Sequence, residues 1–147
     1  MATIAQRAQR QVLRVVNVAH SRLYRISSGR FGASTRGMPV LLLTVAGRKS
    51  GTPHTVPCVY LDEGGSWLVC GSAGGQPAEP QWFRNLRAAT TAEVEVDGVR
   101  RAVWVEVLDG AEREAAWARL VAAAPFFGEY QAKVDRVIPL ARLTPSS

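Results

Sequence analysis

The sequence predicts an α+β protein in which a small, mostly antiparallel β-barrel carries helices on its outside. Three observations indicate this fold: one continuous apolar run, two hairpin signals after it, and helical spacing before, between and after the hairpins. The order of helix, strand, hairpin, helix, hairpin, helix and strand is typical of a barrel with helices packed against it. A length of 147 residues predicts a single core.

An amphipathic, basic helix is predicted at the N-terminus, over residues 4–26. Its apolar side chains fall within an arc of roughly 120°, and arginines cluster on the opposite side. Two interpretations stay open: the apolar stripe packs on the domain, or the helix lies on an anionic membrane surface. Segment 27–37, rich in Gly and Ser, predicts a flexible connection. We therefore divide the chain into residues 1–36, helix and linker, and residues 37–147, the barrel domain.

The predicted strands follow from apolar runs and glycine-containing turns. Residues 39–45 are continuously apolar, which predicts a strand buried on both faces. Two hairpins of one sheet are expected after it, with strands 55–61 and 67–70 across the turn 63–66, and strands 94–96 and 99–108 across the turn 97–98. If the first hairpin turns through the three residues Glu63, Gly64 and Gly65, Cys58 and Cys70 become cross-strand neighbours. We expect both thiols to be reduced.

The remaining segments predict helices and a last strand. Residues 80–87 look helical, with Pro80 at or near the first helical position. Asp109, followed three residues later by Glu112, indicates a capped helix that runs to residue 124, where Pro125 ends it. The expected closing elements are a short helix near 128–136 and an edge strand over 138–143, where proline is tolerated.

Composition and charge exclude several classes of protein. No apolar run approaches the roughly 20 residues of a membrane-spanning helix, and no signal peptide is evident, so we expect a cytoplasmic protein with no disulfide framework. Residues 1–61 hold nine cations and no acid, whereas residues 62–147 hold nine cations and twelve acids. This uneven charge leaves an anionic lipid surface or an anionic cofactor as candidate partners. A nucleic acid is not expected, because the domain offers no extended basic track.

Two glycine-containing loops carry the chemical signal. Residues 46–52 follow the buried strand directly, and their glycines let Arg48, Lys49, Ser50 and the loop amides converge on an anion. The spacing is not that of a nucleotide-binding P-loop, and a solvated basic turn is the alternative interpretation. Residues 71–75 leave another strand end, so the two loops could line one mouth of the barrel. Neither histidine has paired ligand spacing, and no metal site is predicted.

These motifs, in this order, resemble the deazaflavin-dependent nitroreductase family of actinobacteria. The similarity runs from Pro39 through Gly47-Arg48-Lys49-Ser50-Gly51, Ser72 with Gly74-Gly75, and Pro80-Gln81-Trp82-Phe83-Arg84-Asn85-Leu86-Arg87-Ala88 to Tyr130-Gln131 and Arg136-Val137-Ile138-Pro139. It covers roughly residues 37–144. The resemblance implies a split β-barrel that binds coenzyme F420, a 5-deazaflavin with a phosphate and an oligoglutamate tail. Its reduced form would donate hydride to a small acceptor such as a quinone, a nitroaromatic or an enone.

The resemblance also implies a set of site residues. Arg48, Lys49 and Ser50 would hold the phosphate by charge-assisted hydrogen bonds. The strand after the basic loop would pass under the ring system, and the second loop and the short helix would close the pocket. These positions are His54, Thr55, Val56, Pro57, Cys58 and Val59 on the strand, Cys70, Gly71, Ser72 and Ala73 in the loop, and Gln81, Trp82, Phe83, Arg84 and Asn85 on the helix. Aromatic side chains over the active face would be Phe127 and Tyr130, and Tyr130, Ser72 and Phe127 are the candidate catalytic residues.

Departures from the family pattern bear on the acceptor. Phe126 and Phe127 stand where tyrosines are common, so they retain stacking but lose hydroxyl donors. Tyr130 and Ser72 are then the main hydroxyls able to polarise a substrate oxygen. Two rivals remain: a protein of the same fold that binds flavin mononucleotide (FMN), and a non-enzymatic basic module that binds a membrane or nucleic acid. The sequence leaves the oligomeric state open.

Overall fold

The computed structural model describes residues 34–146 of the chain. The helix expected over residues 4–26 lies outside this part, and so does most of the connection after it. The proposed division at residue 36 therefore stays a prediction. At the start of the described residues, β1 (Ser34–Thr35) pairs with the next strand. This end of the expected flexible connection is thus a short strand.

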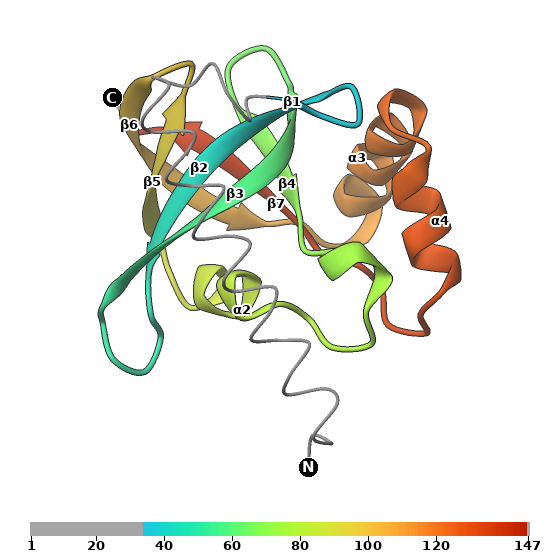
Figure 1. Ribbon diagram of the computed structural model, residues 1–147, viewed down its shortest axis with the longest axis horizontal. Coiled ribbons are helices and arrows are strands. Elements are labelled where there is room, and N and C mark those ends of the chain that lie inside the picture. The colour runs from blue at the N-terminus through green and yellow to red at the C-terminus, as the bar shows by residue number, and fades with distance from the viewer. Residues whose placement is uncertain (1–33, 147) are drawn as a thin grey trace.

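Six antiparallel strands close into a barrel, shown in Figure 1. They are β2 (Met38–Ala46), β3 (Pro53–Asp62), β4 (Trp67–Cys70), β5 (Thr91–Val96), β6 (Val99–Val107) and β7 (Leu140–Pro145). Neighbours follow the order β2-β3-β4-β7-β6-β5, and β5 pairs back onto β2. Both predicted hairpins are confirmed, and they belong to one sheet.

Strand β2 is buried on both faces, as its apolar run predicts. Consecutive side chains from Val40 to Leu43 are all buried, and Leu41 and Leu43 are fully inaccessible. Because successive side chains of a strand point to opposite faces, burial of consecutive residues requires cover on both sides. The strand that leads into the basic loop is therefore held rigidly.

Helix α2 (Gln81–Arg87) closes one end of the barrel, below the strands in Figure 1. Its Phe83 and Leu86 are fully buried in the same apolar cluster as Leu41, Val94 and Leu143 of the strands. Pro80 precedes the first helical residue, close to the predicted start. The opposite side of the helix stays exposed, so α2 fills the barrel end and presents polar residues beside it.

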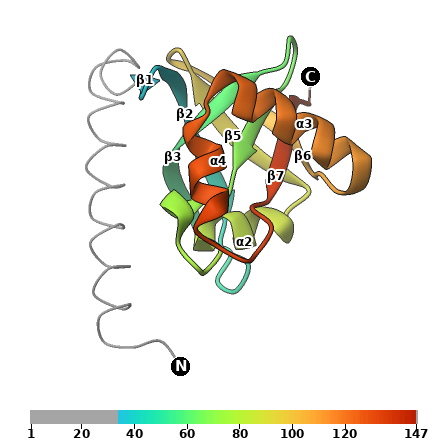
Figure 2. The same ribbon diagram turned by 90° about the vertical axis from the view of Figure 1, so that its right-hand side faces the viewer.

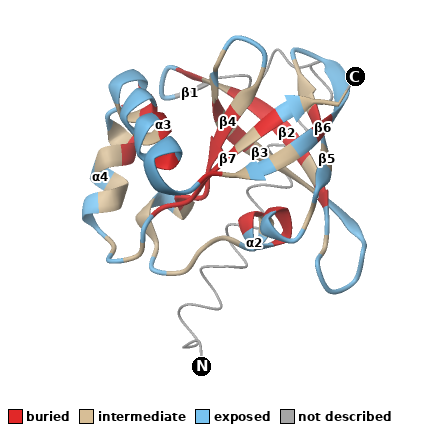
Figure 3. Ribbon diagram, turned by 180° about the vertical axis from the view of Figure 1, so that it is seen from behind, coloured by how far each residue is buried: buried red, intermediate tan, exposed pale blue. Residues whose placement is uncertain are grey.

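A second apolar cluster lies between the outside of the barrel and the helices α3 (Gly110–Ala123) and α4 (Phe126–Ala132). Figure 2 shows both helices against this side, and Figure 3 shows the buried stripe beneath them. On β4, Leu68 and Cys70 belong to this outer cluster, whereas Val69 belongs to the interior one. The alternation fits a strand that packs on both sides.

The expectation that the last strand lies at an edge is wrong. Strand β7 pairs with β4 on one side and with β6 on the other. Leu140, Ala141 and Leu143 are fully buried. Proline is compatible with this position because Pro139 precedes the strand and gives up no ladder hydrogen bond.

The register expected for the first hairpin is also wrong. Tyr60 pairs with Val69, and Asp62 with Trp67, because the turn holds four residues closed by a 3.0 Å hydrogen bond from the Glu63 N–H to the Ser66 carbonyl. A slip of one residue moves every side chain to the other face. Cys58 accordingly lies in the interior cluster and Cys70 in the outer one, and both are buried free thiols.

Two helix starts differ in detail from the prediction. Asp109 precedes α3, but its side chain makes no capping hydrogen bond. Glu112 instead accepts a 2.6 Å hydrogen bond from Arg142 Nη1. Helix α4 begins at Phe126, two residues before the predicted region, because Pro125 already has helical dihedral angles.

Candidate active site

The loop between β2 and β3 is a compact basic turn. The Gly47 N–H donates to the Thr52 carbonyl and the Gly51 N–H to the Gly47 carbonyl, each at 2.8 Å. The Thr52 N–H donates to Ser50 Oγ at 3.1 Å. A Cβ on Gly47 would lie 2.9 Å from Ser50 Oγ, so any larger residue would displace the hydroxyl that accepts the Thr52 N–H. The loop therefore has one closed shape, with Arg48 and Lys49 exposed on it.

Arg48 joins this loop to helix α2. Its Nη1 donates to Asn85 Oδ1 and its Nη2 to Gln81 Oε1, both at 2.8 Å. The Arg48 backbone N–H also donates to Asn85 Oδ1, at 3.1 Å. Both partners are neutral amide oxygens, so they orient the guanidinium and leave its charge uncompensated. The Lys49 ammonium has no ion-pair partner among residues 34–146.

The residues predicted on β3 range from exposed to buried. His54 is exposed, Thr55, Val56, Pro57 and Val59 are half-buried, and Cys58 is buried in the barrel. Thr55 Oγ1 lies 2.7 Å from Thr44 Oγ1 across the ladder with β2. Burial raises the pKa of the Cys58 thiol far above its ordinary value. Cys58 thus contributes to packing, and its neighbours on β3 are the ones that can face a ligand.

The loop after β4 contains a short 3₁₀ helix, η1 (Ala73–Gly75), and packs on α2. A Cβ on Gly71 would lie 2.9 Å from the Phe83 ring, so Phe83 supports this loop from below and is itself fully buried. Ser72 is nearly buried, and its side chain hydrogen-bonds to Cys70. Burial is the main influence on the Cys70 thiol and raises its pKa to about 12.

The aromatic side chains of α4 lie together beside this loop. The rings of Phe126 and Phe127 are 4.6 Å apart, and Tyr130 meets both edge-on. Phe127 is buried in the outer cluster, whereas Tyr130 is half-buried. The Tyr130 hydroxyl accepts a 2.9 Å hydrogen bond from Arg36 Nη1, which leaves its own proton free to be donated. The guanidinium of Arg36 also stacks 4.3 Å over the Phe126 ring.

A continuous line of contacts joins the predicted site residues. Arg48 binds Asn85 on α2, and Phe83 of the same helix supports Gly71. The loop that begins at Gly71 reaches α4, where a Cβ on Gly75 would lie 3.1 Å from the Tyr130 carbonyl oxygen. In Figure 1 this loop lies between α2 and α4. Cys58, Cys70, Phe83 and Phe127 are too deeply buried to face a ligand in this conformation, and they support the residues that are exposed.

Two contributors were not predicted as site residues, although Arg136 opens the matched segment 136–139. Arg36, in the turn before β2, binds Tyr130, and Arg136, after α4, donates hydrogen bonds to the loop that begins at Gly71. Both contacts join segments far apart in the chain, and no local spacing pairs them. The place of Arg136 in that matched segment is the signal that could have found it, and Arg36 had none.

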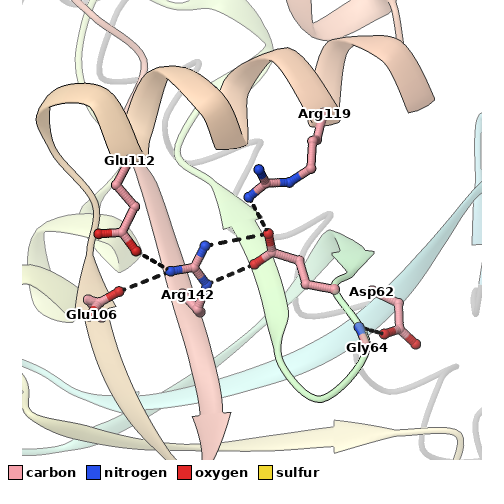
Figure 4. A network of polar contacts seen from close by, with 7 residues as sticks. Asp62, Gly64, Glu106, Glu112, Arg119 and Arg142 are labelled. Atoms are coloured by element: carbon pink, nitrogen blue, oxygen red, sulfur yellow. Dashed lines mark hydrogen bonds and ion pairs between the residues drawn. The ribbon is translucent and has the colours of Figure 1, made fainter.

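A separate polar network lies at the other end of β3, shown in Figure 4. Glu63 accepts hydrogen bonds from Arg142 Nε at 2.9 Å and from Arg119 Nη2 at 2.7 Å, and Arg142 also binds Glu106 and Glu112. Burial alone would raise the pKa of Glu63, but the bonds from Arg142 and Arg119 outweigh it and hold this pKa below its ordinary value. The hollow beside the network pairs acids with arginines, so it offers no net charge to a ligand.

Within residues 34–146, no cluster of three or more His, Cys, Asp or Glu is placed to hold a metal ion. No helix in this part of the chain is long and apolar enough to cross a membrane.

Comparisons with known proteins identify relatives of the whole domain. A family model described as F420H(2)-dependent quinone reductase matches residues 16–145. The F420H(2)-dependent quinone reductase Rv1261c of Mycobacterium tuberculosis (strain ATCC 25618 / H37Rv) is 32% identical over 131 residues, which are 85% of this chain and 87% of that protein. A solved F420-H2 dependent reductase, FDR-A, is 36% identical with a TM-score of 0.66, covering 71% of this chain and 93% of its own. Another solved chain, described as a domain-swapped dimer, is 32% identical with a TM-score of 0.67. The match covers 85% of the present chain and 96% of that solved chain.

Fold, loop geometry and relatives together define a split-barrel oxidoreductase. The similarity extends over most of the chain, at an identity that indicates common descent. The chain belongs to the F420H(2)-dependent quinone reductase family, and its activity is that of an F420H2-dependent oxidoreductase. The alternative of a non-enzymatic basic module is therefore wrong.

Proposed function

We propose that this enzyme binds coenzyme F420 across the basic loop and helix α2, and that it reduces a quinone. The observation that carries the proposal is the setting of Arg48, whose guanidinium is oriented by the neutral oxygens of Asn85 and Gln81. A carboxylate at either position would neutralise it. An oriented and uncompensated guanidinium beside an exposed Lys49 suits an anionic group such as the coenzyme's phosphate.

The loop supplies two different cationic donors to that anionic group. Arg48 supplies oriented N–H groups, Lys49 supplies a mobile ammonium, and the closed turn from Gly47 to Thr52 fixes where both begin. The half-buried side chains of β3 next to the loop would lie along the ring system. Their backbone is held by the ladder with β2, which keeps the surface rigid.

When bound, the reduced coenzyme supplies a hydride and a proton, which convert a quinone to a hydroquinone as the coenzyme is oxidised. Tyr130 is the residue best placed to assist the acceptor. Its hydroxyl accepts a hydrogen bond from Arg36, so its proton can be donated to a quinone oxygen that gains negative charge. Ser72 is less suited to this role, because its side chain is nearly buried and bonded to Cys70. Phe127 would act by packing behind Tyr130.

A titration of the purified protein with oxidised F420 and with FMN, followed by calorimetry, tests the cofactor. We expect binding of F420 and none of FMN at the same concentration. A panel of acceptors with the reduced coenzyme then tests the reaction, and quinones should be reduced faster than nitroaromatics or enones. Preferential binding of FMN would overturn the cofactor assignment, and turnover with nitroaromatics alone would overturn the acceptor.

Docking on an anionic membrane is a further part of the proposal, and it rests on the sequence of residues 4–26 alone. A lipid-soluble quinone is reached most directly at the membrane surface, and an apolar stripe with arginines opposite suits that surface. We expect the intact chain to sediment with anionic vesicles at low salt. A chain that lacks residues 1–30 should no longer sediment with the vesicles, and its affinity for F420 should be unchanged. Loss of F420 affinity or of folding in the truncated chain would mean that the segment is part of the domain.

A further inference from the structure

One guanidinium holds three carbonyl groups of the loop after β4. Arg136 donates from Nη2 to the Ser72 carbonyl at 2.9 Å, from Nε to the Gln76 carbonyl at 3.1 Å, and from Nη1 to the Gly71 carbonyl at 3.2 Å. Arg136 has no carboxylate within ion-pair distance among the described residues. The fork of the guanidinium therefore fixes the start and the end of the loop at once, which a single point donor cannot do.

The backbone that carries Arg136 is itself held at both ends. Gln131 donates from Nε2 to the Arg136 carbonyl at 2.8 Å, and its Oε1 accepts from the Ile138 N–H at 2.9 Å. The Ile138 carbonyl accepts a 2.6 Å hydrogen bond from Arg113 Nη2. The segment from α4 to β7 is thus a rigid strap with Arg136 at its centre.

The loop held by Arg136 also touches α4 directly. Gly75 has φ +82°, and a Cβ there would lie 3.1 Å from the Tyr130 carbonyl oxygen and 3.2 Å from its Cα. The loop therefore cannot shift without disturbing the backbone of Tyr130. Because Gly71 rests on Phe83 of α2, the same loop connects the helix beside the basic turn with the helix that carries the Tyr130 hydroxyl.

We propose that Arg136 is a positioning residue for hydride transfer: it holds the loop from Gly71 to Gln76 so that Tyr130 and the surface beside α2 keep a fixed separation. The proposal rests on the proposed function, in which the coenzyme lies along α2 and β3 and the acceptor meets Tyr130. In that function the phosphate end of the coenzyme would be held by Arg48 and Lys49, and Arg136 would take no part in holding it. Loss of its fork should accordingly affect turnover far more than coenzyme binding.

The substitution Arg136→Lys keeps the charge and removes the fork. We expect kcat to fall about 10- to 100-fold, because small displacements of reacting groups are costly, while the Kd for oxidised F420 changes by less than about threefold. Arg142→Lys is the matched control, since Arg142 is also a partly buried arginine with several hydrogen bonds. Arg142 belongs to β7, and its polar network lies at the other end of β3. This control variant should lower the melting temperature and leave kcat and Kd close to wild type.

Hydrogen–deuterium exchange on the protein without coenzyme gives a readout that does not depend on activity. The Gly75 N–H bonds to the Ser72 carbonyl and the Gln76 N–H to the Ala73 carbonyl. Both amides should exchange at least about tenfold faster in Arg136→Lys, and neither should change in Arg142→Lys. If the proposed function fails, wild type will not turn over with any acceptor, yet this exchange result still tests the role of Arg136 in the loop.

A second variant covers the case in which Arg136→Lys does not fold. Gln131→Met keeps the length of the side chain and removes both bonds that hold the strap, with the guanidinium intact. Like Arg136→Lys, this variant should lower kcat and leave the affinity for F420 unchanged. The proposal is contradicted if either folded variant keeps wild-type kcat, if Kd rises by as large a factor as kcat falls, or if Arg142→Lys loses as much kcat as Arg136→Lys.

Discussion

Asn85 Oδ1 accepts two hydrogen bonds from Arg48, one from the guanidinium at 2.8 Å and one from the backbone N–H at 3.1 Å. A buried amide on α2 thereby fixes both the side chain and the backbone of Arg48, which lies 37 residues earlier in the chain, in the basic loop. The acceptor is neutral, and this neutrality matters as much as the geometry, because the positive charge stays available to an anion.

Replacement of the Asn85 amide by a carboxylate tests whether the positive charge of Arg48 matters, while its hydrogen-bond acceptor is kept. Asn85→Asp keeps an oxygen in place for Arg48 and adds a negative charge that compensates the guanidinium. We expect a folded protein whose affinity for oxidised F420 is lower by about tenfold or more, measured by calorimetry. Unchanged or tighter binding would show that the charge of Arg48 does not serve the coenzyme.

Lys49 tests the loop without touching α2. Lys49→Ala should weaken F420 binding roughly 10- to 100-fold, the usual worth of a hydrogen bond to a charged group, and leave the melting temperature near wild type because the side chain is exposed. Arg101→Gln is the control for loss of one positive charge, since Arg101 is exposed on β6, away from the loop. Equal losses in both variants would indicate a general effect of net charge.

Glu63 links stability to pH at the other end of the barrel. Its pKa is below the ordinary value in the folded protein because the bonds from Arg142 and Arg119 outweigh the opposing effect of burial. Because the pKa of Glu63 is lower in the folded than in the unfolded protein, the ionised carboxylate stabilises the fold. This stabilisation is complete above the unfolded pKa, which is about 4.3 for Glu. It is lost as the pH falls through the folded pKa. The free energy of unfolding should therefore fall below about pH 4.3, and less steeply in Glu63→Gln.

Measurement of urea unfolding between neutral and acid pH checks this prediction. At neutral pH, Glu63→Gln should cost about 1.5 to 3 kcal/mol, because Arg142 and Arg119 lose a charged acceptor. F420 affinity should not change, since the network is remote from Arg48. If the free energy of unfolding depends on pH identically in wild type and Glu63→Gln, Glu63 is not the group that causes this dependence.

The two thiols should be inert in the folded protein. Burial raises the pKa of Cys70 to about 12 and that of Cys58 further, so few thiolates form at neutral pH. A thiol reagent should modify neither cysteine until the protein unfolds, and the double variant Cys58→Ala, Cys70→Ala should retain turnover. Rapid modification of native protein would contradict the burial, and abolished turnover in a folded double variant would give the thiols a catalytic role.

The sequence predicts the local elements of this fold well and their long-range partners poorly. The apolar run of β2 and the glycines of the hairpin turns act through neighbouring residues, and these elements are confirmed. The place of β7 is not local: Pro139 suggested an edge, but it precedes a strand that β4 and β6 enclose. The Cys58 register failed by one residue because the turn holds four residues, a choice that glycines alone do not decide.

The candidate site divides in the same way. Arg48 and Lys49 could be selected from the sequence because a basic turn between glycines is a local pattern. That Asn85 and Gln81 orient Arg48, and that Arg136 holds the Gly71 loop, depends on how α2 and the strap pack after folding. Several predicted contacts, Phe83 and Cys58 among them, are core residues, since a motif does not tell which of its side chains turn inward.

Hydride transfer from reduced F420 to a quinone can be followed in a single turnover by rapid mixing. Protein loaded with reduced F420 in the absence of oxygen is mixed with one equivalent of quinone, and oxidised coenzyme and hydroquinone are both measured. We expect the two products to appear together in equal amounts, and more slowly in Arg136→Lys than in Arg142→Lys. Oxidised coenzyme that does not form, or that forms without hydroquinone, would contradict it.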